Sequence, residues 1–251
     1  MPGRFSGKVA IITGSSFGIG RETALLFAKE GAEVTVTGRS EERLQGTKKA
    51  LLGAKVPESN FIIVPADITT SSGQDTLISK TLERFGKIDI LVNNAECHRN
   101  DPEKAHLAKT KGDIVNVSSI VALKAGWAHA PYYPLAKAAL DQYTRSAAID
   151  LIYEGIRVNT VNPGIVETGF HGQATGLSED ASKKFYDDMG SNRNAIPCGF
   201  SGRTDHIAKA IAFLADRDTS EYIVGQNIIA DGGTSLVLGI HTQFPRQTEK
   251  L

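Results

Sequence analysis

Tyr133 and Lys137 are the residues whose types and spacing indicate chemistry most directly. They stand four positions apart in the run Tyr-Pro-Leu-Ala-Lys, and residues with this spacing share one face of a helix. A phenol normally keeps its proton up to about pH 10, and a nearby ammonium favours the phenolate. Ser119 lies fourteen residues before the tyrosine and could hold a carbonyl oxygen beside that phenol. The three side chains predict a proton donor for carbonyl reduction, or an acceptor for alcohol oxidation.

The same tyrosine–lysine spacing is common among ordinary surface neighbours on a helix. Whether it marks a catalytic site therefore depends on the helices and strands that surround it. Short apolar runs rich in Val and Ile predict buried strands, and 3.6-residue periodicity predicts helices. Strands are expected at Lys8–Thr13, Glu33–Thr37, Phe61–Val64, Ile88–Val92, Asp113–Val117, Arg157–Val161 and Gln226–Ala230. Helices are expected at Ile19–Glu30, Ser40–Leu52, Ser71–Phe85, Tyr133–Tyr153, Ser178–Met189 and Thr204–Ala215. Ser71 and Gln74 have the spacing of a capping box. This alternation predicts an α/β fold, a doubly wound parallel sheet in a single domain spanning residues 1–251.

A glycine-rich turn joins the first expected strand to the first expected helix. It contains Thr13, Gly14, Ser15, Ser16, Gly18, Ile19 and Gly20. Backbone N–H groups at such a helix start can hold a diphosphate, and the glycines permit the tight turn. The run Gly14–Gly18 also matches the G-x-S-x-G elbow of a serine hydrolase, with Ser16 as nucleophile. That fold needs strands upstream, and only thirteen residues precede Gly14. A glycine turn without a ligand is the third interpretation.

The end of the second strand indicates which dinucleotide the turn would bind. Enzymes that use NAD place a carboxylate there, about 20 residues after the glycines, to bond the ribose hydroxyl. This chain has Gly38-Arg39-Ser40 at that place, and Arg39 offers a planar cation suited to a phosphate. The residues therefore favour NADP over NAD. The alternative is that Arg39 is a solvated residue at a helix start.

Composition limits the remaining functions. Lys and Arg number 28, as do Asp and Glu, so the net charge is zero and no general attraction to nucleic acid or anionic membranes is expected. The two cysteines and six histidines have no metal-ligand spacing, so we expect no metal site. The N-terminus has no signal-peptide pattern, and no apolar run is as long as a membrane span. We expect a cytoplasmic protein that acts on a small molecule.

Several motifs in the right order make the chain similar to the classical short-chain dehydrogenase/reductase family, closest to its tropinone-reductase-like and glucose-dehydrogenase-like members. The matching stretches are Thr13–Gly20, Asp67-Ile68, Asn93-Asn94-Ala95, Asn116–Ser119, Tyr133–Lys137, Asn162-Pro163-Gly164 and Asp231-Gly232-Gly233. The resemblance covers nearly the whole chain. It implies a single Rossmann-type domain and reversible, NADP-dependent interconversion of a carbonyl and a secondary alcohol.

The resemblance also implies a role for each matching residue. Ser119 would hold the substrate oxygen, Tyr133 would pass the proton, and Lys137 would lower the tyrosine's pKa and bond the nicotinamide ribose. Asp67 and Ile68 would contact the adenine, with Asn93 and Ala95 lining the same channel, although an aspartate there is also ordinary turn chemistry. The nicotinamide carboxamide would be seated by Pro163, Gly164, Ile165 and Thr168. Residues 169–197 would form a lid over the substrate, with Phe170, Phe185, Tyr186 and Phe200 as candidates for its apolar wall, and residues 241–251 a loose tail.

Three features depart from the family pattern. Only residues 97–111 remain to cross from the fourth strand to the fifth, where relatives carry a long helix that supplies a relay asparagine and much of the dimer interface. Glu96 stands where the family has glycine, and Pro134 directly follows the tyrosine. The alternatives are therefore an impaired nucleotide-binding relative or a deletion variant, and a homo-oligomer that would lack its usual interface helix.

Overall fold

The computed structural model describes residues 3–95, 104–123, 130–169, 176 and 178–237. Within these residues the strands form a seven-stranded sheet in the order β3-β2-β1-β4-β5-β6-β9. Every neighbouring pair in it is parallel. The strands are β1 (Val9–Ile12), β2 (Glu33–Gly38), β3 (Phe61–Pro65), β4 (Ile90–Asn93), β5 (Asp113–Val117), β6 (Arg157–Pro163) and β9 (Asn227–Ala230). This strand order confirms the predicted doubly wound parallel sheet.

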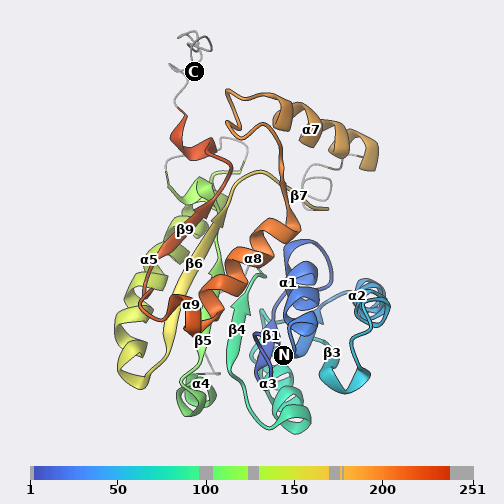
Figure 1. Ribbon diagram of the computed structural model, residues 1–251, viewed down its shortest axis with the longest axis vertical. Coiled ribbons are helices and arrows are strands. Elements are labelled where there is room, and N and C mark those ends of the chain that lie inside the picture. The colour runs from blue at the N-terminus through green and yellow to red at the C-terminus, as the bar shows by residue number, and fades with distance from the viewer. Residues whose placement is uncertain (1–2, 96–103, 124–129, 170–175, 177, 238–251) are drawn as a thin grey trace.

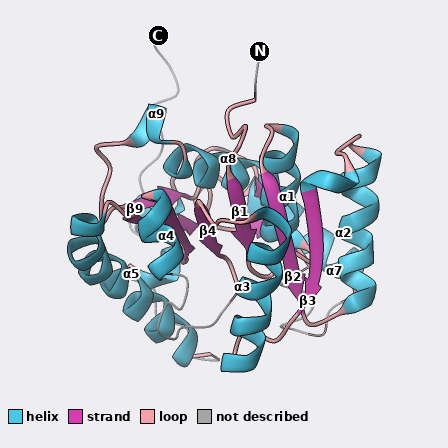
Figure 2. Cartoon of the chain, turned by 90° about the horizontal axis from the view of Figure 1, so that it is seen from below, coloured by secondary structure: helices cyan, strands magenta, loops and turns pink. Residues whose placement is uncertain are grey.

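Helices cover both faces of this sheet (Figure 2). One face carries α1 (Gly18–Lys29), α2 (Glu41–Gly53) and α8 (Thr204–Ala215), and the short α9 (Arg217–Ser220) follows α8. The other face carries α3 (Ser71–Phe85), α4 (Lys104–Thr110) and α5 (Tyr132–Leu151). Strands buried on both faces read as continuous apolar runs in the sequence, which is why their positions were predictable.

The segment after β6 lies beyond the carboxyl ends of the strands (Figure 1). It contains β7 (Val166–Glu167), which pairs with β8 (Gly202–Arg203), and α7 (Glu179–Ser191). Ser178 caps α7 by accepting a hydrogen bond from the Ala181 N–H. The proposed lid is thus partly described, since residues 170–175 and 177 lie outside the described residues, as does the 241–251 tail.

The crossover from β4 to β5 contains α4 among its described residues. Leu107 of α4 is fully buried in the core between α3 and α5. Lys104 pairs with Asp150 of α5 at 3.4 Å and with Glu154, in the turn Ile152–Glu154 that follows α5, at 2.9 Å. These contacts dock the short helix onto its neighbour. Residues 96–103, which include Glu96, lie outside the described residues.

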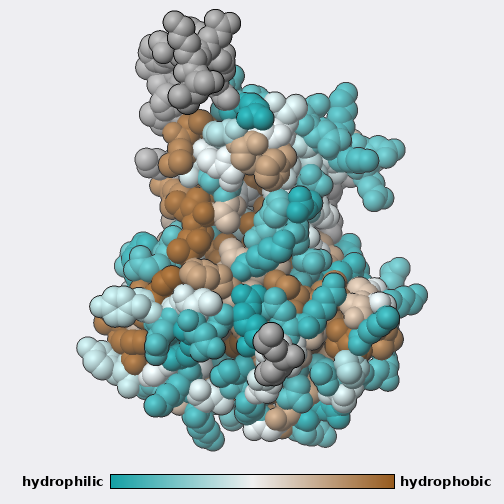
Figure 3. Space-filling model, viewed as in Figure 1, coloured by the Kyte–Doolittle hydropathy of each residue, from teal (hydrophilic) through white to brown (hydrophobic). Residues whose placement is uncertain are grey.

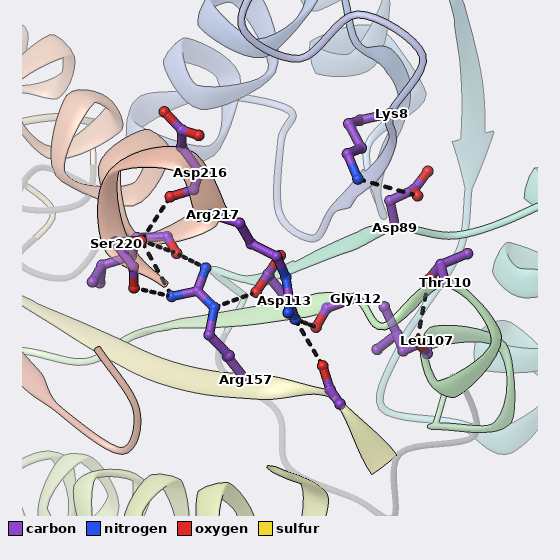
Figure 4. A network of polar contacts seen from close by, with 12 residues as sticks. Lys8, Asp89, Leu107, Thr110, Gly112, Asp113, Arg157, Asp216, Arg217 and Ser220 are labelled. Carbon is purple, nitrogen blue, oxygen red and sulfur yellow. Dashed lines mark hydrogen bonds and ion pairs between the residues drawn. The ribbon is translucent and has the colours of Figure 1, made fainter. Parts of the chain in front are cut away.

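Polar contacts tie the amino-terminal edge of the sheet together (Figure 4). Arg157, at the start of β6, lies 2.8 Å from Asp113, at the start of β5. The Arg157 guanidinium also donates to the carbonyls of Leu214 and Ser220. Arg217 donates to the second oxygen of Asp113. The network therefore joins two strands to α8 and α9, at the end of the sheet opposite to β7 and α7.

The surface shows apolar side chains along the β9 edge and the C-terminal turn Thr234–Leu236 (Figure 3), with Ile229 and Leu236 exposed there. Among the described residues, no helix combines the length and the apolar character needed to cross a membrane.

Candidate active site

A cavity of about 820 Å³ opens at the carboxyl ends of the strands. Its walls come from the turn after β1, the ends of β2 to β6, the start of α5 and one side of α7. Among the predicted site residues, those lining it are Gly14, Ser16, Gly18, Ile19, Arg39, Asp67, Ile68, Ala95, Ser119, Tyr133, Lys137, Pro163, Gly164, Ile165 and Thr168. Thr13, Ser15, Gly20 and Asn93 are not part of its wall. The fold thus brings most of the predicted site together in one cavity.

The glycine turn needs its glycines for measurable reasons. Gly14 and Gly18 have φ values of 63° and 59°, a region that L side chains rarely adopt. A Cβ on Gly20 would lie 2.5 Å from the Gly14 carbonyl oxygen and 2.6 Å from the Asn94 amide nitrogen. Phe17 at the N-cap of α1 provides no side-chain cap, and the first turn carries no acid. The N–H groups at this helix start are thus available to an anion.

Hydrogen bonds from Thr13 and Ser15 fix the position of this turn on the side away from the cavity. The Thr13 hydroxyl donates to the Val92 carbonyl and accepts from the N–H groups of Asn94 and Ala95. The Ser15 hydroxyl donates to the Ile12 carbonyl. The Asn94 amide donates to the carbonyls of Thr13 and Gly14 at 3.0 and 3.2 Å. These contacts fix the turn against the end of β4.

Three arginines gather beside the turn at the end of β2. Arg39 and Arg43 line the cavity, and the Arg43 guanidinium lies 5.2 Å from the centroid of the Phe17 ring. Arg21 donates to the carbonyls of Ser16 and Arg43. Burial, and then the charge of Arg43, lower the pKa of Arg21. A cluster of cations beside a cavity is a suitable environment for a phosphate.

Asp67 follows β3 on the same side of the cavity. Its carboxylate accepts from the Thr69 N–H and hydroxyl at 3.0 and 2.8 Å. These bonds, chiefly that from the Thr69 backbone, lower the pKa of Asp67, and the charge of Arg39 adds to the effect. Asp67 is therefore an ionised side chain in an ordered turn.

Ser119, Tyr133 and Lys137 converge at the other end of the cavity. The Lys137 side chain is only 8% exposed, and its Nζ donates to the Val117 carbonyl at 3.1 Å. That nitrogen lies 5.7 Å from the centroid of the Tyr133 ring. The Ser119 hydroxyl accepts from the Val121 N–H at 3.3 Å, which leaves its own proton to be donated. Phenol, ammonium and hydroxyl therefore face the same space.

Pro134 fits the start of α5. The helix begins at Tyr132, one residue before the predicted start, so Pro134 is the third residue of its first turn. The first four N–H groups of a helix have no partner within it, and a proline there loses no hydrogen bond. The Tyr133 N–H donates to the Ala130 carbonyl at 3.1 Å.

Asn93 points away from the cavity wall into a buried chain of polar groups. Its amide donates to Asn116 at 3.0 Å. Asn116 in turn donates to Thr144, whose hydroxyl lies 2.6 Å from that of Thr160. These hydrogen-bonded side chains link β4, β5, α5 and β6. Asn94, its neighbour in the sequence, contributes to the cavity wall instead.

The loop after β6 completes the cavity. A Cβ on Gly164 would lie 2.7 Å from the Cα of Asp231, so only glycine fits between these segments. The Tyr186 hydroxyl donates to the Thr168 carbonyl at 3.1 Å, and Phe185 and Tyr186 line the cavity. Phe200 is not in its wall, and Phe170 lies outside the described residues. Thus α7 contributes two of the four aromatic residues considered for an apolar wall.

Some cavity residues carry no sequence signal of their own. Arg43 and Thr69 line the cavity, yet neither belongs to a predicted motif. Arg43 reaches the site because it lies in the first turn of α2, on the side facing Phe17. Only its basic character near Arg39 could have suggested this.

The cavity fits a nicotinamide dinucleotide. One end has the glycine cradle and a helix start for a diphosphate, flanked by cations and the ionised Asp67. The other has the tyrosine, lysine and serine beside the Pro163–Thr168 loop. Within the described residues no cluster of three or more His, Cys, Asp or Glu side chains could hold a metal ion.

Comparisons with known proteins agree with this geometry. The family model described as short chain dehydrogenase matches residues 8–110, and that described as Enoyl-(Acyl carrier protein) reductase matches residues 100–235. The meso-2,3-butanediol dehydrogenase of Serratia marcescens is 31% identical, over 92% of this chain and 96% of its own.

Two solved structures from Caenorhabditis elegans are more similar. One is a short-chain dehydrogenase/reductase of unknown function with cofactor, which is 51% identical over 95% of this chain and 98% of its own, with a TM-score of 0.88. The other is a glucose dehydrogenase in the apo form, 48% identical over 93% of this chain and 100% of its own, with a TM-score of 0.80. The hydrolase interpretation of Ser16 is not favoured, because that serine lies within the dehydrogenase match. The chain belongs to the short-chain dehydrogenase/reductase family and is related to oxidoreductases that act on alcohols and carbonyls.

Proposed function

We propose that the protein is an NADP-dependent oxidoreductase that interconverts a carbonyl and a secondary alcohol, with Tyr133 as general acid and base. The observation that carries this proposal is the meeting of Tyr133, Lys137 and Ser119 in a cavity that also reaches Arg39. The related butanediol and glucose dehydrogenases indicate a polyol, sugar or hydroxyketone as the substrate class.

In the reducing direction, the Ser119 hydroxyl donates a hydrogen bond to the carbonyl oxygen and holds it beside Tyr133. The phenol then gives its proton to that oxygen as the C–O bond gains alcohol character. A nicotinamide cofactor, when bound, supplies the hydride to the carbonyl carbon or takes it back. In the oxidising direction Tyr133 removes the hydroxyl proton, and the Lys137 ammonium favours the phenolate that this step needs.

Lys137 is suited to this role because of where it is buried. The side chain donates to the Val117 carbonyl, and the nitrogen lies beneath the phenol ring. An ammonium shielded from water acts on a neighbouring ionisable group more strongly than an exposed one. The Pro163–Thr168 loop would hold the nicotinamide end of the cofactor opposite this pair.

NADP is favoured over NAD because of charge at the end of β2. Gly38 and Arg39 occupy the place of the carboxylate that bonds a ribose hydroxyl in NAD enzymes, and Arg43 and Arg21 add positive charge nearby. An additional phosphate would be attracted there, whereas a carboxylate would repel it. The lid would be residues 169–197, of which α7 contributes Phe185 and Tyr186 to the cavity.

The experiment measures binding and turnover separately. Titration of the purified protein with NADPH and NADH, followed by cofactor fluorescence, should give a lower Kd for NADPH. Loss of one charge-assisted contact in Arg39→Ser, worth about 1.5–3 kcal/mol, should raise the NADPH Kd roughly tenfold to a hundredfold and leave the NADH Kd nearly unchanged.

A panel of ketones, ketoses, diols and polyols should then show turnover with NADPH or NADP. Binding of NADPH without turnover of any member would reject the oxidoreductase and favour an impaired nucleotide-binding relative. Equal affinity for both cofactors would reject the NADP assignment alone.

A further inference from the structure

Asp141 is a buried carboxylate on the helix that carries Tyr133 and Lys137. It lies one helical turn after Lys137 and is 4% exposed. Its Oδ2 accepts from the Asn162 side-chain amide at 2.8 Å, and its Oδ1 has no hydrogen-bond partner among the described residues. Burying a carboxylate with incomplete hydrogen bonding is costly. A side chain kept at such a cost calls for a function beyond packing.

Asn162 connects this carboxylate to the catalytic end of the cavity. It is fully buried at the end of β6, and its amide nitrogen donates both to Asp141 and to the Ser119 carbonyl, the latter at 3.0 Å. The next residues in the chain, Pro163 and Gly164, form the cavity wall. The amide of Asn162 therefore lies between the segment that bears the serine and the loop expected to hold the nicotinamide.

The carboxylate fixes which way this amide faces. An ionised carboxylate only accepts hydrogen bonds, and an amide has one donating and one accepting side. If Asn162 turned over, its oxygen would face the Asp141 oxygen and the Ser119 carbonyl, which also accepts. With Asp141 in place, the donating side is held toward both acceptors. The Asn227 amide supports this orientation by donating to the Asn162 oxygen at 3.4 Å.

We propose that Asp141 is a positioning residue that, through Asn162, fixes the backbone of Ser119 relative to Tyr133. The proposal rests on the proposed function for its kinetic consequence. Displacement of a reacting or orienting group by about 1 Å can cost about a hundredfold in rate. Since the contact fixes the Ser119 backbone and does not touch the Arg39 end of the cavity, its loss should lower kcat by a larger factor than it raises the Kd for NADPH.

Two variants with the same branching at Cγ separate the effect of the hydrogen bond from the effect of the charge. Asp141→Leu removes the acceptor, and we expect kcat to fall roughly tenfold to a hundredfold, while the Kd for NADPH rises by a smaller factor. Asp141→Asn keeps an oxygen that can accept from Asn162. It should retain kcat within about fivefold of the wild type, since neutral and charged acceptors differ by about 1 kcal/mol.

A matched control accounts for lost stability. Leu151→Ala removes a buried side chain further along the same helix, away from the cavity, and should lower the urea midpoint with kcat unchanged. Hydrogen–deuterium exchange of the peptide containing Ser119 and Val121 gives a readout that does not depend on turnover. Exchange there should rise in Asp141→Leu and remain at the wild-type level in Asp141→Asn and Leu151→Ala.

The outcomes distinguish the two proposals. Equal losses of kcat in Asp141→Leu and Asp141→Asn, or unchanged kcat and unchanged exchange in Asp141→Leu, would overturn the positioning role. If the wild-type protein turns over no substrate, the proposed function fails, and the exchange result alone decides whether Asp141 fixes Ser119.

Discussion

Replacement of Arg157 by methionine should remove the strongest support of the sheet's amino-terminal edge (Figure 4). The Arg157 side chain is 2% exposed, and its Nε lies 2.8 Å from Asp113 Oδ1. Its terminal nitrogens donate to the Ser220 and Leu214 carbonyls at 2.6 and 2.8 Å. Methionine has a similar length but no donor, so the buried Asp113 carboxylate loses one of its two cations. The Ser220 and Leu214 carbonyls each lose one of their donors.

The size of the loss follows from this burial. Removing one partner of a buried ion pair costs about 3–5 kcal/mol, because the remaining groups stay desolvated. With a urea m value of about 3 kcal/mol/M, the unfolding midpoint should fall by about 1–2 M. Arg217→Met is the matched comparison, because its side chain is 30% exposed while it also donates to Asp113. It should cost only about 1–2 kcal/mol.

The effect of Arg157→Met should also depend on pH. Burial raises the pKa of Asp113, and the charges of Arg157 and Arg217 oppose the rise. A folded-state pKa above the unfolded value means that ionised Asp113 reduces stability as the pH rises through that window. Loss of Arg157 raises this pKa further. The difference in unfolding free energy between variant and wild type should therefore be largest at neutral pH and shrink toward about pH 4.

Urea unfolding of wild type, Arg157→Met and Arg217→Met at several pH values measures all of these quantities. An unchanged midpoint for Arg157→Met, or a larger loss for Arg217→Met, would refute the reasoning. A difference that grows as the pH falls would refute the role given to Asp113. The NADPH affinity of the folded variants should be unchanged, because the network lies at the edge of the sheet opposite to the cavity.

Three further predictions follow from single contacts. Leu107→Ala removes the fully buried contact of α4 and should lower the free energy of unfolding by about 2–5 kcal/mol; a loss below 1 kcal/mol would mean that α4 is not docked. Gly20→Ala places a Cβ 2.5 Å from the Gly14 carbonyl oxygen. A strain of about 1–3 kcal/mol should weaken NADPH binding by roughly fivefold to 150-fold, which fluorescence titration would show. Hydrogen bonds from Lys209 and then Arg203 lower the pKa of Asp205 to about 2, so this carboxylate contributes stability above about pH 4 that is lost as the pH falls toward 2. Acid titration of Asp205→Asn should show a shallower loss over that range, by less than about 1 kcal/mol because the pair is exposed.

The sheet could be predicted from the sequence because its strands are buried on both faces and therefore appear as continuous apolar runs. The position of the candidate site could be predicted from the order of the motifs, because the residues expected to bind or react lie where parallel strands end. Local details, such as helix caps, did not follow from these patterns. Thr70 caps α3 by accepting from the Gly73 N–H, so the predicted box of Ser71 and Gln74 is wrong, and Gln74 instead donates to the Ile68 carbonyl. Neighbouring polar residues offer competing caps, and only the backbone path chooses between them.

Contacts between distant segments had no sequence signal. Asp141 and Asn162 are 21 residues apart and on different elements, so neither spacing nor periodicity relates them. Similarly, Asn93 and Asn94 are indistinguishable in the sequence, yet one points into the polar chain behind Lys137 and the other into the turn after β1. The pleat of a strand alternates side chains between faces, and the end of the strand determines which residue reaches the cavity.

The most direct test of the central claim compares Tyr133→Phe with the wild type in binding and in turnover. The variant removes one hydroxyl and keeps the ring that packs above Lys137. We predict an unchanged Kd for NADPH and a loss of turnover of at least about a hundredfold, as expected for a general acid and base, on every substrate of the panel. Turnover within a few-fold of the wild type would contradict the assignment of Tyr133 as the proton donor.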